Sequence, residues 1–294
     1  MMEVPSGTAS DYVLEDSPEG RTLVVTGSWS DEAAEVLARG EADGLVLNYA
    51  RGFSEVNLEF LAGWKVRRLN VLDRGIVDLD PIGRLGASLE ELSVQAAPGA
   101  GLALAELPYL RSISGEWGML RDALTAVQQL RSVRTWQFDE ADLRAFRDHV
   151  QLERLSIKEA PHLESLAGAA DLPDLAVLGV FLARKLNNIS DVAEHAASLR
   201  HLEFEGCGGI DLLDDVEGLV KLRFLAVSDC GEIESLGPVG PLEEIEVLHA
   251  WGTTRIVDED LSPLERLPRL REIRMRDRPG YKPRVSDLVA ALST

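Results

Sequence analysis

The side chains with the clearest potential for chemistry gather in one stretch of the sequence. His201, Glu203 and Glu205 alternate with apolar residues, and His249 follows further along the chain. Imidazoles and carboxylates are metal ligands or general acids and bases. If they lie on strands, alternate side chains are about 6.6 Å apart, whereas the ligands of one metal ion must converge on it at about 2.1 Å. We therefore expect no metal, no other cofactor and no catalytic residue here.

Motifs for nucleophilic catalysis or nucleotide binding are missing from the sequence. There is no G-x-S-x-G elbow, no G-x-x-x-x-G-K-[ST] loop and no G-x-G-x-x-G after a strand. The glycines of the Gly206–Gly209 stretch fit turns that need a positive φ. We expect that the protein is not an enzyme.

Composition and charge narrow the class of partner. The chain has 294 residues, 45% of them apolar but only 5% aromatic, which favours many small core layers over one aromatic-centred core. A net charge of −20 disfavours nucleic acid and anionic membranes and favours a basic protein or a cationic ligand. The acidic start and the lack of a long apolar run predict a cytoplasmic protein, and the preference for arginine over lysine is typical of GC-rich bacterial genomes.

A fixed period organises the chain. The strand template L-x-x-L-x-V recurs with starts 20 to 25 residues apart, most often 23. A further aliphatic residue follows eleven positions after many starts, and position 9 of the template is usually small. The clear copies start at Ala42, Val66, Leu89, Leu152, Leu175, Leu199, Leu222, Ile245 and Leu270, and weaker copies start at Leu110 and Leu130. The later aliphatics are Val77, Leu163, Leu186, Ile210, Ile233 and Ile256, and the small residues are Ala50, Ala97, Ala160, Ala183, Cys207, Cys230 and Thr253.

This template resembles the leucine-rich-repeat family, in its short class of 22 to 24 residues with Cys or a small residue at position 9. The resemblance covers roughly residues 42–281. It implies an α/β repeat solenoid, a right-handed curved horseshoe with a concave parallel sheet and with convex turns, 3-10 segments and short helices. The burial of apolar side chains supports the same fold, because a single repeat can bury its apolar positions 1, 4 and 6 only when neighbouring repeats stack on it.

The segments between and beyond the strands complete the expected organisation. Residues 210–219 place an aliphatic at every third position, the period of a 3-10 turn, whereas 120–129, 140–150 and 190–197 are expected to be helical. Residues 1–41 are predicted to contain a flexible N-terminus, loose over residues 1–18, and a cap made of a strand over 21–26 and a helix over 31–39 with Ser30 as its N-cap. Residues 282–294 are predicted to form a C-terminal cap with a helix over 287–292, capped by Ser286.

Positions 3, 5 and 7 of the template alternate with the buried ones and are expected to face out of the concave sheet. Large aromatic side chains gather at these positions although the chain has few of them, and exposed aromatic patches often mark interaction sites. We predict a protein–protein interaction scaffold that binds its partner through this face, and an inhibitor of a basic protein is one version of it. The predicted partner-binding residues are Arg154, Lys158, Phe181, His201, Phe224, His249 and Trp251.

Charge segregation along the chain supports two alternatives. Residues 203–246 hold twelve acids and two bases, whereas residues 266–284 hold eight bases and two acids. The basic end could make an anion- or ligand-sensing module that uses Arg274 and Arg276. The acidic and basic regions of successive molecules could also meet, which would make the chain a self-assembling structural protein.

The two cysteines, Cys207 and Cys230, occupy the same template position in adjacent repeats. Alanine fills this position elsewhere, so a small buried residue is the preferred interpretation. A disulfide or a redox switch is the alternative.

Overall fold

The computed structural model describes residues 11–292, which form two compact units. Unit 1 holds the described residues up to Gly115 together with Asp122–Gln129, and unit 2 holds Glu116–Arg121 and the described residues from Leu130 onward. Helix α2 (Trp117–Ala123) therefore contributes residues to both.

Unit 1 begins with an antiparallel hairpin and continues as a parallel sheet. Strand β1 (Tyr12–Ser17) pairs with β2 (Gly20–Val25), and the order β2-β3-β4-β5-β6 is parallel throughout. The strand over residues 12–17 corrects our prediction that residues 1–18 are loose, although residues 1–10 of that prediction lie outside the described residues. The further strands are β3 (Gly44–Asn48), β4 (Arg68–Leu72), β5 (Glu91–Gln95) and β6 (Ser112–Glu116).

The expected N-terminal helix is present. Helix α1 (Asp31–Ala38) begins after Ser30, whose hydroxyl accepts a hydrogen bond from the amide of Ala33 at 3.2 Å. An N-cap of this kind satisfies an N–H group that the first helical turn leaves without a partner. The predicted cap residue is therefore confirmed, and the predicted end of the helix is within one residue.

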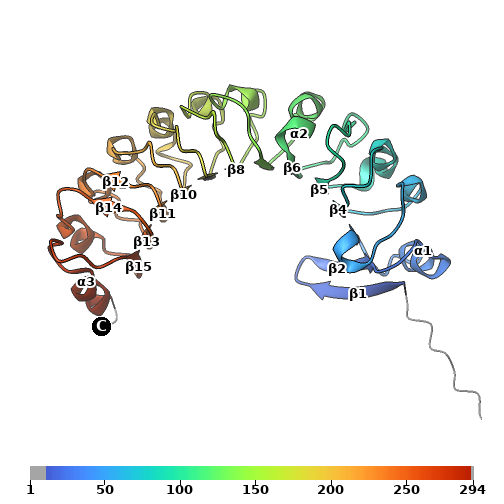
Figure 1. Ribbon diagram of the computed structural model, residues 1–294, viewed down its shortest axis with the longest axis horizontal. Coiled ribbons are helices and arrows are strands. Elements are labelled where there is room, and N and C mark those ends of the chain that lie inside the picture. The colour runs from blue at the N-terminus through green and yellow to red at the C-terminus, as the bar shows by residue number, and fades with distance from the viewer. Residues whose placement is uncertain (1–10, 293–294) are drawn as a thin grey trace, which may run out of the picture. The chain divides into compact units, whose positions relative to one another are not determined.

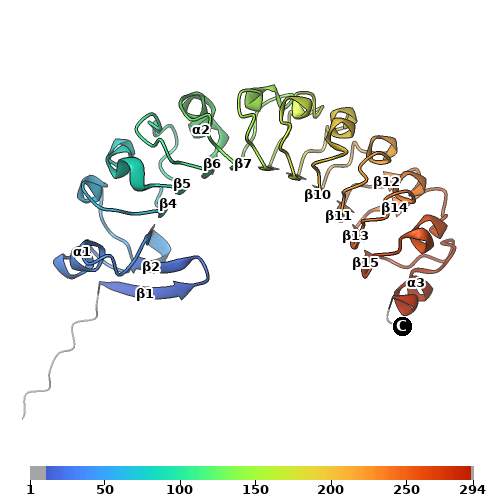
Figure 2. The same cartoon turned by 180° about the vertical axis from the view of Figure 1, so that it is seen from behind.

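Unit 2 stacks one parallel strand per repeat in the order β7-β8-β9-β10-β11-β13-β15. Within this unit the strands line the inner side of a curve and the 3-10 segments lie on its outer side (Figures 1 and 2). A second, two-stranded parallel sheet joins β12 (Glu232–Ile233) to β14 (Arg255–Ile256). The main strands are β7 (Ser132–Trp136), β8 (Arg154–Lys158), β9 (Val177–Phe181), β10 (His201–Glu205), β11 (Phe224–Ser228), β13 (Val247–Ala250) and β15 (Glu272–Met275).

The core lies between the strands and the 3-10 segments of each repeat. Template positions 1, 4 and 6 are buried, as Leu199, Leu202 and Phe204 show in one repeat. Stacking removes these side chains from water although each repeat alone would leave them exposed. Trp117 is 1% exposed and packs against Phe138, with ring centroids 4.6 Å apart, so this tryptophan belongs to the core.

Several segments that were expected to be α-helical contain 3-10 turns instead. The 3-10 turn expected in 210–219 is present, but 144–146 and 190–195 are also 3-10 segments rather than α-helices, and in the region 120–129 α2 gives way to a 3-10 turn. Buried residues recur every third position there, as in Leu143, Phe146 and His149, which suits 3.0 residues per turn. The 3-10 segments are Tyr49–Arg51, Glu59–Leu61, Asp80–Ser88, Leu124–Ala126, Arg144–Phe146, Ala169–Asp171, Ser190–His195, Asp214–Val216, Gly237–Val239 and Ser262–Arg266.

The C-terminal helix α3 (Val285–Ala291) begins two residues earlier than predicted. Ser286 lies inside the helix, so its assignment as the N-cap is wrong. The carboxylate of Asp277 accepts a hydrogen bond from the amide of Val285 at 3.3 Å and thus takes the place of a cap from outside the helix. Among the described residues, no helix is both long and apolar enough to cross a membrane.

Candidate partner-binding face

The outward template positions of unit 2 align across neighbouring strands. Position 3 forms one row along β8, β9, β10, β11, β13 and β15, because each residue pairs in register with its neighbour on the next strand. All members of the row are half-buried or exposed, which confirms that this position faces out of the sheet. The row consists of Arg154, Val177, His201, Phe224, Val247 and Glu272.

Three rings form a continuous cluster in the middle of this face. The imidazole of His201 stacks on the ring of Phe224, with centroids 4.0 Å apart and an interplanar angle of 4°. The imidazole of His249 meets the same ring edge-on, at 5.1 Å and 77°. These are the offset-stacked and edge-to-face arrangements that aromatic rings prefer. The structure therefore brings together three of the predicted residues, which we call the ring cluster: His201, Phe224 and His249.

Carboxylates surround the ring cluster. Nε2 of His249 lies 3.0 Å from a carboxylate oxygen of Glu272, which also accepts a hydrogen bond from Nε of Arg274 at 2.7 Å. Nε2 of His201 lies 3.4 Å from the carboxylate of Glu203. The hydrogen bond from His249 and the positive charge of Arg274 lower the pKa of Glu272, which keeps this carboxylate ionised.

Trp251 is the most exposed of the predicted aromatic residues. It follows β13 directly, and 52% of its surface is accessible. The guanidinium carbon of Arg276 lies 5.9 Å from the centroid of the indole ring, a cation–π distance. Trp251 therefore presents a large apolar surface next to the ring cluster.

Phe181 is separated from the ring cluster. Its ring lies over Gly179 on its own strand, where an added Cβ atom would come 2.8 Å from the ring. Its neighbour on β10 is the exposed Glu205, and no aromatic ring within residues 11–292 stacks on Phe181. Its outward orientation is confirmed, but the expected patch from Phe181 to Trp251 is divided by an acidic side chain.

Basic side chains mark both flanks of the face. Arg154 and Lys158 are exposed on β8, with Arg154 3.7 Å from the carboxylate of its neighbour Glu153. On the other flank, Arg274 pairs with Glu272 and Arg276 lies over Trp251. The two arginines proposed to bind an anion are thus already in contact with groups of the protein.

From the sequence, Glu203 was considered only as a possible metal ligand, and Glu272 was not named as a functional residue. The available signal was their template position: Glu203 is the next outward residue after His201 on β10, and Glu272 is an outward residue of β15, the strand that pairs with the strand of His249. No cluster of three or more histidine, cysteine, aspartate or glutamate side chains between residues 11 and 292 could hold a metal ion.

The chain matches no family model and no curated protein. Among solved structures it is similar to internalin C2 of Listeria monocytogenes, at 17% identity over 70% of this chain and 76% of that one, with a TM-score of 0.38. A second Listeria internalin, internalin F, shows 15% identity over 73% and 77% of the two chains, with a TM-score of 0.37. A leucine-rich-repeat protein of Leptospira interrogans shows 16% identity over 74% of this chain and 57% of that one, with a TM-score of 0.48.

The internal evidence for the fold is the repeat itself. The aliphatic template recurs along the sequence, each copy supplies one parallel strand, and short 3-10 segments lie opposite the strands. The buried template positions stack from repeat to repeat. These features identify the chain as a protein of the leucine-rich-repeat fold.

Proposed function

We propose that this chain is a non-catalytic scaffold that binds a protein partner through the concave face of unit 2. The observation that carries the proposal is the exposure of Trp251 beside the ring cluster. Water contact with so large an apolar side chain is unfavourable, and tryptophan is favoured at the energetic centres of protein interfaces. Arg154 and Lys158 on one flank supply polar contacts at the rim.

Preorganisation supports the same proposal. Phe224 is held between two imidazoles, and His249 is held by Glu272. Side chains that are already fixed lose little conformational entropy when a partner binds, so a few anchors suffice for a useful affinity.

Two other functions receive less support from the contacts. For anion sensing, Arg274 is already paired with the carboxylate of Glu272, and Arg276 lies over the indole ring of Trp251. Head-to-tail assembly relies on separate acidic and basic regions, but Arg269 and Arg271 of the basic region already pair with Glu244 and Glu246 of the acidic one. Anion sensing would show itself as anion binding that weakens with salt. Head-to-tail assembly would show itself as a particle size that changes between low and high salt.

A comparison of baits in a lysate of the native cell tests the proposal. The baits are the wild type, Trp251→Ala, the triple variant Phe181→Ala/Phe224→Ala/Trp251→Ala, and the control Val220→Ala. Val220 is 51% exposed and follows the 3-10 segment Asp214–Val216 rather than the end of a strand, so it matches Trp251 in exposure but not in position. Circular dichroism must first show that every variant keeps its fold.

We expect a protein that is retained by the wild type and by Val220→Ala but lost from both tryptophan variants. Retention of the same proteins by all four baits, or by none of them, would rule out the concave face as the binding surface.

A further inference from the structure

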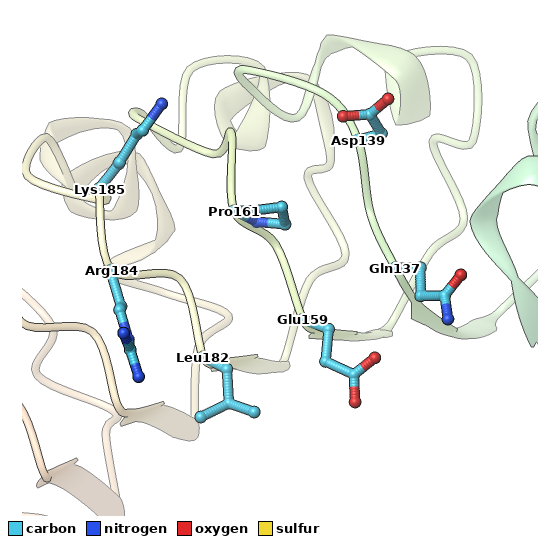
Figure 3. Close-up of a pocket in the computed structure, with 7 residues that line it drawn as sticks. All are labelled: Gln137, Asp139, Glu159, Pro161, Leu182, Arg184 and Lys185. Atoms are coloured by element: carbon cyan, nitrogen blue, oxygen red, sulfur yellow. The ribbon is translucent and has the colours of Figure 1, made fainter.

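An open pocket of about 770 Å³ lies at the carboxyl ends of β7, β8 and β9, away from the ring cluster. Its walls come from three successive repeats, through residues 137–139, 159–161 and 182–185 (Figure 3). The volume is in the range of about 300–1,000 Å³ that is typical of ligand sites. A site at this edge of the sheet does not depend on the proposed concave surface.

Strained backbone surrounds this pocket. Gln137, Glu159 and Leu182 occupy equivalent positions in the three repeats, and all have φ between 54° and 59°. The left-handed region is unfavourable for residues with a side chain, and in the next repeat the same position is taken by Gly206. The conformation recurs at Asp229 and Gly252 in later repeats and thus belongs to the repeat, whereas the pocket lies where residues with a side chain adopt it in three successive repeats.

Leu182 is the least expected of these three residues. It combines a left-handed backbone with a side chain that is 43% exposed. Its Cδ2 atom lies over Gly206, where an added Cβ atom would come within 2.9 Å of it. Neither burial nor backbone preference explains a leucine here, whereas an apolar anchor for a ligand does.

The charged side chains of the pocket are available to a ligand. The side chains of Glu159, Arg184 and Lys185 make no ion pair or hydrogen bond with any residue in the range 11–292. Elsewhere in the repeats such charges pair across neighbouring repeats, as Arg131 does with Glu153. The pocket therefore presents a carboxylate from one repeat and two cations from the next.

The arrangement of these groups restricts the ligand. Two cations disfavour a metal ion, and Glu159 together with Asp139 disfavours a polyanion. Pro161 lies on the middle segment and, with Leu182, provides apolar surface between the opposite charges (Figure 3). A complementary ligand carries a cation, an apolar group and an anion in that order.

We propose that this pocket binds an extended peptide segment in which a basic, an apolar and an acidic residue occupy alternate positions, in that order. The basic residue faces Glu159, the apolar residue contacts Leu182, and the acidic residue faces Arg184 and Lys185. Alternate side chains of an extended peptide point to the same side about 6.6 Å apart, so a segment of about five residues presents all three groups to the pocket.

A titration with blocked pentapeptides tests the proposal. The probe has an acetylated N-terminus, an amidated C-terminus and the order lysine, alanine, leucine, alanine, aspartate, and binding to the full chain is followed by isothermal titration. In a second peptide lysine replaces the aspartate. We expect a Kd of about 1 mM for the first peptide and binding about tenfold weaker for the second.

Charge reversal separates a specific site from general attraction. In the Arg184→Glu/Lys185→Glu variant the preference must invert, so that the peptide with two lysines binds better. Arg147→Glu, a reversal of an exposed charge outside the pocket, must leave the preference unchanged. Leu182→Asn must weaken both peptides without loss of stability, because asparagine tolerates the left-handed conformation.

The proposal fails if the wild type does not bind the first peptide at several times 1 mM, or if the reversal leaves the preference as it was. It also fails if Trp251→Ala abolishes binding, since the peptide would then occupy the concave face instead. In contrast, loss of a lysate partner from Trp251→Ala together with normal peptide binding would support both the concave partner-binding face and the separate peptide pocket.

Discussion

The imidazole of His201 lies flat against the ring of Phe224, with centroids 4.0 Å apart and planes 4° from parallel. The two residues are direct neighbours on strands β10 and β11, so the sheet register itself brings the rings together. On the other side, His249 contacts the same ring edge-on. Phe224 thus links two histidines that are 48 residues apart in the sequence.

Phe224→Leu should destabilise the fold more than Phe181→Leu does. Both changes keep an apolar side chain on the concave face, but only Phe224 has ring partners within residues 11–292. Each aromatic pair contributes about 0.5–1.5 kcal/mol beyond the burial of area. Urea unfolding followed by circular dichroism measures the difference, and equal losses for the two variants would show that the ring contacts contribute nothing.

The carboxyl of Glu272 should make the stability of the fold depend on pH. The hydrogen bond from His249 and the charge of Arg274 lower its pKa below the ordinary value of 4.5. A carboxylate with a lowered folded-state pKa adds stability above pH 4.5, and this stability is lost as the pH falls through the folded-state value. In His249→Leu, which removes the hydrogen-bond donor, an NMR titration of the Glu272 carboxyl should give a pKa closer to 4.5. An unchanged pKa would mean that His249 does not act on this carboxylate.

Two adjacent threonines should differ sharply in their contribution to stability. The hydroxyl of Thr254 accepts a hydrogen bond from the amide of Cys230 at 3.0 Å and donates one to the carbonyl of Val227. Thr254→Val leaves both buried groups without a partner, which costs about 1–3 kcal/mol for each such group. The control is Thr253→Val, because the side chain of Thr253 is exposed. Chemical unfolding should show a large loss for the first variant and almost none for the second.

The same pair of threonines shows where the sequence template misplaces a residue. Counting nine positions from Ile245 selects Thr253, but Thr254 fills the buried place at 2% exposure. Thr254 lies one position later in its repeat than Cys230 does in the preceding one. The next buried aliphatic, Ile256, nevertheless keeps the same position as Ile233, because the segment before it is one residue shorter. A gapless alignment cannot detect two changes that cancel.

Other failures of the template have the same origin. Val77 fits the aliphatic position of the template, but it is 70% exposed and Ile76 is buried in its place. Ala50 is exposed inside a 3-10 turn, and Ala97 is half-buried. These residues lie in unit 1, whereas Ala160, Ala183, Cys207 and Cys230 in unit 2 are fully buried as predicted.

The strands and their outward faces were predictable because alternation in a strand is fixed by geometry. The ring contacts were not, since the template states which residues face outward but not their rotamers. The pocket at residues 137–185 was also missed, because the left-handed position 8 is occupied by three different side chains there. Only the glycines at 206 and 252 gave a sequence signal for that backbone conformation.

Replacement of Gly206 by alanine should destabilise the fold, because Gly206 has a left-handed backbone. Its φ is 67°, and an added Cβ atom would meet Leu182 at 2.9 Å. Gly206→Ala should therefore cost about 1–2 kcal/mol, the usual penalty of this region for a residue with a side chain. Gly208→Ala is the control, because an added Cβ atom there has no neighbour within 4 Å among the described residues. Comparable stability of the two variants in thermal unfolding would contradict the strain at position 206.

The two thiols should be inert in the folded protein and reactive after unfolding. Cys207 and Cys230 are fully buried free cysteines, and each Sγ donates a weak hydrogen bond to a backbone carbonyl. Burial raises the pKa of Cys207 to about 11 and that of Cys230 to about 12, so the reactive thiolate is scarce at pH 8.

Mass spectrometry after iodoacetamide treatment at pH 8 should therefore find no labelled cysteine in the native protein and two in urea. Cys230→Ala provides the control, because alanine already fills the equivalent position at Ala160 and Ala183, and this variant should unfold near the wild-type midpoint and gain one label in urea. Rapid labelling of the native protein would instead mean that the repeats around Cys207 and Cys230 open readily. It would favour the redox interpretation of this pair over that of small core residues.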